Sequence, residues 1–161
     1  MSETAPQPPL MVVVQYVKDL SFEVPNAPLV YGQLRSPPRV DINLDVQARR
    51  LNEGSNQYEV VLAVRAEAKE DVPNGESVFV AELAYGGLFT VNVPEEQIEP
   101  VVLVECPRIL FPFARAILAD TSRNGAFPPV MLQPIDFYAL WQNRRAQNAA
   151  DAAAAAPVRN A

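Results

Sequence analysis

The chain contains no histidine among its 161 residues and a single cysteine, Cys106. Histidine is the commonest general base, the usual partner of a serine or cysteine nucleophile and the most frequent transition-metal ligand, so its absence excludes most hydrolytic schemes. One cysteine can form neither an internal disulfide nor a cysteine-rich zinc site, and it indicates a reducing compartment. The sequence therefore predicts a protein that is not an enzyme and that holds no metal or cofactor.

No stretch of the sequence is typical of a membrane span or a secretory signal. The longest apolar region, residues 101–118, contains Glu105, Arg108 and Arg115, and charges at such intervals are costly in a bilayer. The first nine residues carry an acid and three prolines where a signal peptide would place positive charge and then an apolar run. We therefore expect a cytoplasmic protein without direct membrane insertion.

Basic residues are the minority, with 13 against 19 acidic residues and a formal net charge of −6. This charge repels nucleic acids and anionic lipid, and it suits a partner with a basic docking face. Gly86 and Gly87 lack the spaced glycines and the following Lys-Ser/Thr of a phosphate loop, so they indicate a bulge or a close backbone approach. Asp41 and Asp45 belong to no loop of alternating oxygen ligands, and no metal site is predicted.

Four segments have strand character, and residues 40–46 and 58–68 show the alternation of apolar and polar residues that is typical of a sheet with one buried face. The four segments are residues 11–23, 40–46, 58–68 and 78–85. Turns rich in Asn and Gly join the last three segments into an antiparallel meander. The proline-rich connection after residues 11–23 is too long for a tight turn, so this strand is expected to cross over rather than pair with its sequence neighbour.

The pattern changes to helix from Glu95 onward. A long helix is predicted from Pro107 to Asn124, with Gly125 in a left-handed cap, and the last helix has Asp136 as its N-cap. Strands followed by helices indicate an α+β fold. We divide the chain into a mobile tail over residues 1–10, one folded domain over residues 11–148 and a mobile alanine-rich tail over residues 149–161.

Five segments between residues 12 and 145 share the pattern of one protein family. They are residues 16–28 (YVKDLSFEVPNAP), 58–64 (YEVVLAV), 79–89 (FVAELAYGGLF), 106–115 (CPRILFPFAR) and 125–137 (GAFPPVMLQPIDF). In this order and combination they are highly specific, and the chain resembles the SecB family of bacterial protein-export chaperones. The resemblance implies a four-stranded antiparallel sheet with helices packed on one side, assembled into a homotetramer that is a dimer of dimers.

The resemblance also implies an ATP-independent chaperone that binds unfolded precursor polypeptides and delivers them to the SecA motor. The positions that match the family's SecA-docking surface are Asp19, Glu23, Val80 and Glu82. The hydrophobic client groove is expected near Tyr31, Val40, Ile42, Leu44, Phe137, Leu140 and Trp141. The oligomer interface is expected at Ala81, Leu83, Tyr85, Ile109, Phe113 and Ile117.

Each of these sets has a plainer interpretation that the residues alone leave open. Strand acids are often simply solvated, and every groove residue is also a plausible core residue. A broad core within one subunit would explain the apolar helix as well as a subunit interface does. Two other functions therefore stay open: a structural oligomer that binds no client, and a small hydrolase that uses Cys106 or a pair of carboxylates.

Overall fold

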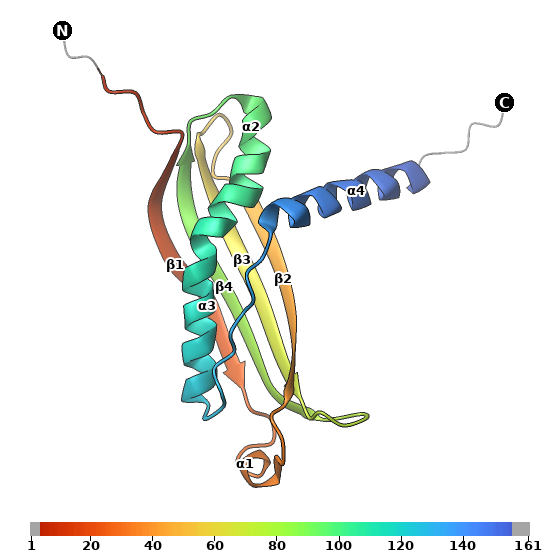
Figure 1. The fold of residues 1–161 in the computed structure, drawn as a ribbon. Helices are drawn as coiled ribbons and strands as arrows, with labels where there is room; N and C mark the ends of the chain where they lie inside the picture. Colours follow the sequence, from red (N-terminus) through yellow and green to blue (C-terminus); the bar gives the residue numbers. More distant parts are fainter. Residues whose placement is uncertain (1–3, 156–161) are drawn as a thin grey trace, which may run out of the picture.

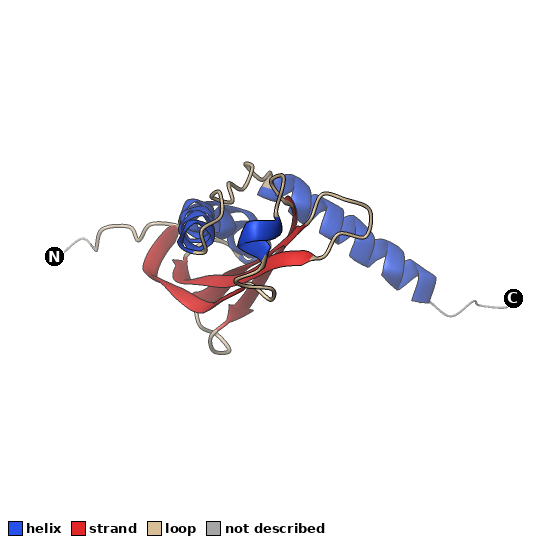
Figure 2. Cartoon of the chain, turned by 90° about the horizontal axis from the view of Figure 1, so that it is seen from below, coloured by secondary structure: helices blue, strands red, loops and turns tan. Residues whose placement is uncertain are grey.

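The computed structural model describes residues 4–155 and has an α+β architecture, as predicted. One antiparallel sheet contains four strands, and the helices lie against one of its faces (Figures 1 and 2). In chain order the elements are β1 (Leu10–Glu23), α1 (Val30–Gln33), β2 (Arg39–Arg50), β3 (Gln57–Lys69), β4 (Ser77–Val91), α2 (Glu95–Pro100), the π-helical turn η1 (Val101–Glu105), α3 (Cys106–Asn124) and α4 (Phe137–Ala155).

The strands lie in the order β1-β4-β3-β2. β2, β3 and β4 form the predicted meander, and β1 crosses over to pair with β4, which confirms the expectation for the first strand. The register places Val46, Leu62 and Tyr85 opposite one another across three strands. β1 and β2 are therefore the two edges of the sheet.

The two faces of the sheet differ because residues alternate along each strand. The face toward α3, called the helix face, carries the core, with Val60, Leu62 and Phe89 fully buried. α3 covers this face through Leu110 and Leu118, which are also buried. No helix covers the opposite face, called the open face, in the described chain (Figure 2).

Two glycines, Gly86 and Gly125, lie where an aromatic ring packs closely against the backbone. A side chain at Gly86 would lie 2.8 Å from the Tyr16 ring, so the predicted close backbone approach at this position is confirmed. Gly125 follows α3 with a φ of −82°, so the prediction of a left-handed cap there is wrong. The left-handed residue is Ala126, with a φ of 65°, and Gly125 is small because the Phe22 ring lies against it.

The structure describes parts of both predicted tails. Asn92 donates hydrogen bonds to the carbonyls of Pro8 and Pro9, which ties the end of the expected N-terminal tail to the fold. Asp136 caps α4 as predicted, because its Oδ1 accepts a hydrogen bond from the Ala139 amide at 3.0 Å. α4 then projects away from the sheet and stays helical to Ala155 (Figure 1). The remainder of the tail, residues 156–161, and residues 1–3 lie outside the described residues.

Candidate client groove and docking face

An apolar cavity of about 550 Å³ lies between the start of β2 and the segment that joins α3 to α4. Its volume is in the usual range for a ligand site. The lining residues are Pro37, Pro38, Val40, Ile42, Phe79 and residues 127–135. None of these side chains is titratable, so the cavity can bind by apolar contact and backbone hydrogen bonds but offers no acid, base or nucleophile.

The wall formed by residues 127–135 is extended because of its sequence. Its prolines at 128, 129 and 134 prevent helix formation and remove backbone donors. Phe127 anchors one end, with its ring centroid 4.8 Å from that of Phe79 and 5.4 Å from that of Tyr31. The buried Ser122 hydroxyl accepts a hydrogen bond from the Val130 amide at 2.8 Å. The wall is thus fixed to the helix face, while Met131 is 52% exposed beside the cavity.

The predicted groove residues fall into three groups. Val40 and Ile42 line the cavity, and Tyr31 adjoins it through its stacking on Phe127. Leu44 packs against the core farther along β2. Leu140 and Trp141 lie on α4 outside the cavity, where the Trp141 Nε1 donates a hydrogen bond to Glu99 at 3.0 Å.

Phe137 corrects the prediction most clearly. Its side chain is 1% exposed and meets the Phe111 ring edge-on, so it has no surface left for a ligand. The sequence reasoning also missed Phe127, Met131 and Ile135 as lining residues. The signal that could have found them is a run of apolar residues interrupted by prolines, which can be neither helix nor central strand.

The predicted docking residues lie together on the open face. Glu23 is opposite Val80, and Asp19 is opposite Ala84, two positions from Glu82, so the three acids form one surface that we call the acidic patch. Glu82 pairs with Arg65 at 3.2 Å, and Arg65 also holds Glu67 at 2.8 Å. The Arg65 hydrogen bond lowers the pKa of Glu67. Asp19 and Glu23 form no ion pair within residues 4–155.

Comparison with known proteins decides the family. The family model described as preprotein translocase subunit SecB matches residues 3–148. The chain belongs to the SecB family. It is 66% identical over 152 residues to the protein-export protein SecB of Granulibacter bethesdensis, covering 91% of this chain and 89% of that one. It is 57% identical over 159 residues to the SecB of Acidiphilium cryptum, covering 92% and 95%.

A solved structure shares the fold of this SecB-family chain. It is the Mycobacterium tuberculosis Rv1957 SecB-like chaperone in complex with a ChAD peptide from the Rv1956 HigA1 antitoxin. The TM-score is 0.63 at 15% sequence identity, and the match covers 78% of this chain and 90% of the other. The four-stranded sheet with helices on one side is therefore the fold of a SecB-like chaperone.

The expected interface residues of this SecB-family chain separate into buried and exposed sets. Ala81, Leu83 and Tyr85 are buried on the helix face by the chain's own α3, which leaves them no side-chain surface for a second subunit. This corrects the expectation for those three. Phe113 is 49% exposed on α3, and Ile109 and Ile117 are partly buried beside the core.

Cys106 lies at the start of α3 with no exposed surface. Burial, aided by the neighbouring Glu105, raises the pKa of its thiol to about 12. Such a thiol is a poor nucleophile at neutral pH. Among residues 4–155 no group of His, Cys, Asp or Glu is placed to hold a metal ion. The same residues include no helix that is long and apolar enough to cross a membrane.

Proposed function

We propose that this SecB-family chain is an ATP-independent export chaperone that binds unfolded precursor proteins in the cytoplasm and delivers them to the SecA motor. The observation that carries the proposal is the apolar cavity with exposed Met131 and Ile42 at its border and no titratable side chain in its lining. Such a site recognises apolar side chains without regard to their order and acts by binding alone.

The edge of the sheet beside the cavity adds a second mode of recognition. Within residues 4–155, β2 pairs only with β3, so one side of its backbone is free beside Val40 and Ile42. An extended polypeptide can add hydrogen bonds to such an edge while its apolar side chains enter the adjacent cavity. The peptide held by the mycobacterial SecB-like chaperone supports peptide binding by a chain of this fold. Unfolded segments rich in aromatic and aliphatic residues suit both features.

The outer edge and α3 support assembly into a homotetramer. β1 is an edge strand with a row of exposed apolar side chains, an arrangement that monomeric proteins avoid. These side chains are Met11, Val12, Val13, Val14, Val17 and Leu20. Phe113 adds exposed aromatic surface on α3. Phe113 stacks on Tyr85, which lies opposite Val17, so α3 and β1 together offer an apolar surface for subunit contacts.

The acidic patch supports docking of SecA. Asp19 and Glu23 are exposed, and Val80 contributes a partly exposed apolar member beside them. A basic segment of a partner would be attracted to the three acids and would contact the valine. Because the patch lies on the open face and the cavity on the helix face, one chain can hold a client and the motor together.

Titration with a reduced, unfolded precursor tests client binding directly. The wild type is expected to form a complex of defined mass by light scattering and to delay aggregation at stoichiometric concentration. Met131→Asp places a charge at the apolar cavity and should weaken binding about tenfold. Val72→Asp is the matched control, because Val72 is equally exposed but lies in the β3–β4 turn.

Three outcomes of this titration separate the functions. Loss of client affinity in Met131→Asp but not in Val72→Asp supports the groove. A wild type that neither binds the precursor nor delays its aggregation favours a structural oligomer without clients. Client binding that is lost in Cys106→Ala, with the fold intact, would revive a role for the cysteine.

A further inference from the structure

A polar cluster lies on the open face beside the acidic patch. Glu59 on β3 is 7% exposed although no described helix covers it. It accepts hydrogen bonds from the Lys18 Nζ at 2.8 Å, the Arg49 Nε at 3.0 Å and the Tyr16 hydroxyl. The first of these bonds, together with that from Tyr16, lowers the pKa of Glu59 to about 2. Burial and the neighbouring carboxylate raise the pKa of Tyr16 to about 12.

Two features of the backbone build this cluster. The register of β1 shifts between Val17 and Asp19, and a β-bulge of this kind turns a side chain to the other face. Lys18 and Asp19, although consecutive, therefore both lie on the open face, Lys18 against Glu59 and Asp19 in the acidic patch. The Tyr16 ring packs over Gly86, where a side chain would clash with it, and so its hydroxyl reaches Glu59.

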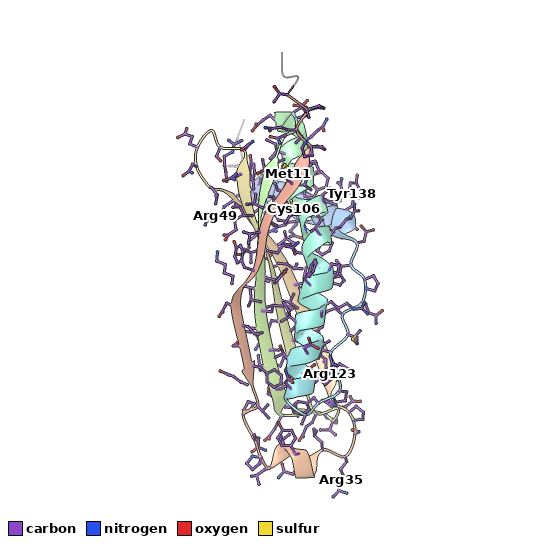
Figure 3. The ribbon with its side chains drawn as sticks, turned by 90° about the vertical axis from the view of Figure 1, so that its left-hand side faces the viewer. Met11, Arg35, Arg49, Cys106, Arg123 and Tyr138 are labelled. Atoms are coloured by element: carbon purple, nitrogen blue, oxygen red, sulfur yellow. The ribbon has the colours of Figure 1, made fainter. Side chains whose placement is uncertain are left out.

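The cluster contains more cation than its carboxylate requires. One cation neutralises Glu59, whereas Lys18 and Arg49 together leave a surplus of one positive charge. Within residues 4–155, Arg49 contacts Glu59 through Nε alone, so both terminal nitrogens of the guanidinium remain as donors. The two side chains are 47% and 63% exposed and border a cavity of about 280 Å³ with Gln47. Figure 3 shows Arg49 on the side of the sheet away from α3.

We infer that Lys18 and Arg49, positioned by Glu59, bind a carboxylate of the segment that docks on the acidic patch. This inference rests on the proposed docking function and specifies the partner's chemistry: a basic stretch with one acidic side chain at a fixed distance. Lys18 and Glu23 lie at the two ends of the surface, about 17 Å apart at about 3.3 Å per residue. A segment of that charge pattern is held at both ends, which fixes its position on the face.

A double-mutant cycle between protein and peptide tests the inference. The probes are two synthetic peptides with the same lysine-rich stretch, one with glutamate and one with glutamine about five residues away. If net charge alone decided affinity, the glutamine peptide would bind more tightly to every acidic variant, because it carries one negative charge fewer. The inference predicts the opposite on the wild type: the glutamate peptide binds about three- to fivefold tighter. Lys18→Met with Arg49→Gln should abolish or reverse that preference.

Two further variants guard against misfolding and simple charge effects. Adding Glu59→Gln to the double variant removes the carboxylate that has lost its cations. This triple variant should also lose the preference for the glutamate peptide, and it should still unfold in a cooperative thermal transition. Arg39→Gln with Lys69→Gln makes the same change in net charge at the far end of the open face, where the two residues are opposite one another. That control should keep the preference for glutamate.

The failure of this inference differs from the failure of docking. If neither peptide binds, or if Asp19→Asn with Glu23→Gln leaves their affinity unchanged, the docking function on the open face is wrong and the inference falls with it. If both peptides bind through the patch but the glutamine peptide is tighter on every protein, docking stands and the carboxylate site is overturned.

Discussion

The helix face and the open face are made from the same strands but have opposite chemistry. On β3, Val60 and Leu62 lie in the core, whereas Glu59 on the other face is held by Lys18 and Arg49. The helix face ends in an apolar cavity at the edge of the sheet, and the open face carries the acidic patch. Because side chains alternate between the two faces of a strand, the same strands present one surface suited to apolar clients and another suited to a charged partner.

The largest expected effect is a difference in the free energy of unfolding between substitutions on the two faces. Phe89→Ala empties a fully buried position on β4 and should lower the free energy of unfolding by about 3–5 kcal/mol. Val80→Ala, on the open face of the same strand, should cost about 1 kcal/mol or less. Urea denaturation at one fixed protein concentration measures both, since assembly would couple stability to concentration. Equal losses would mean that the open face is packed as tightly as the core.

A smaller effect concerns Glu59, a buried acid of the open face. Glu59→Gln should destabilise the chain by about 1–3 kcal/mol at neutral pH, because two cations lose their carboxylate. The pKa of Glu59 is lowered from an ordinary 4.5 to about 2, so the unfolded chain binds more protons between those values. The stabilisation is complete above about pH 4.5 and is lost as the pH falls toward 2.

Unfolding measured across this pH range checks the sign of the effect. The difference between wild type and Glu59→Gln should shrink as the pH falls. Glu67→Gln is a useful comparison, because Arg65 also lowers the pKa of that carboxyl but Glu67 is more exposed than Glu59. A difference that stays constant down to pH 2 would show that Glu59 contributes through packing and not through its charge.

The smallest effect separates the faces by their response to salt. Raising the ionic strength from about 0.05 to about 0.5 M should weaken motor binding severalfold, because exposed charges are screened. Client binding at the apolar cavity should change little or strengthen. Calorimetric titration of both ligands in the same buffers measures the contrast. The same salt dependence for both ligands would contradict separate apolar and charged sites.

Local patterns predicted the elements because periodicity and capping are properties of neighbouring residues. The crossover of β1 followed from a long proline-rich connection, and Asp19 and Glu23 share a face because they are four positions apart in the strand. Lys18 could not be placed in this way, because the bulge beside it breaks the period of two. Residues 127–135 gave no periodic signal, and their role as a wall arises from Phe127 and Ser122 in the tertiary fold.

The misplaced residues have a similar cause. Ala81, Leu83 and Tyr85 alternate as interface residues would, but the sequence does not show whether a subunit's own α3 or a second subunit covers them. Phe137 is likewise an aromatic residue of the kind that lines a groove, but its side chain lies in the core. Gly125 was predicted to adopt a left-handed conformation, but in the structure the absence of a side chain at this position leaves room for the Phe22 ring.

Crossed binding measurements on two variants test the central claim, that each face has its own ligand. One variant is Met131→Asp at the cavity, and the other combines Asp19→Asn, Glu23→Gln and Glu82→Gln in the acidic patch. Affinities for an unfolded precursor and for SecA are measured on both. The cavity variant should lose about tenfold in precursor affinity alone, and the patch variant should lose affinity for SecA alone. Loss of both ligands in either folded variant would contradict the separation of the two faces.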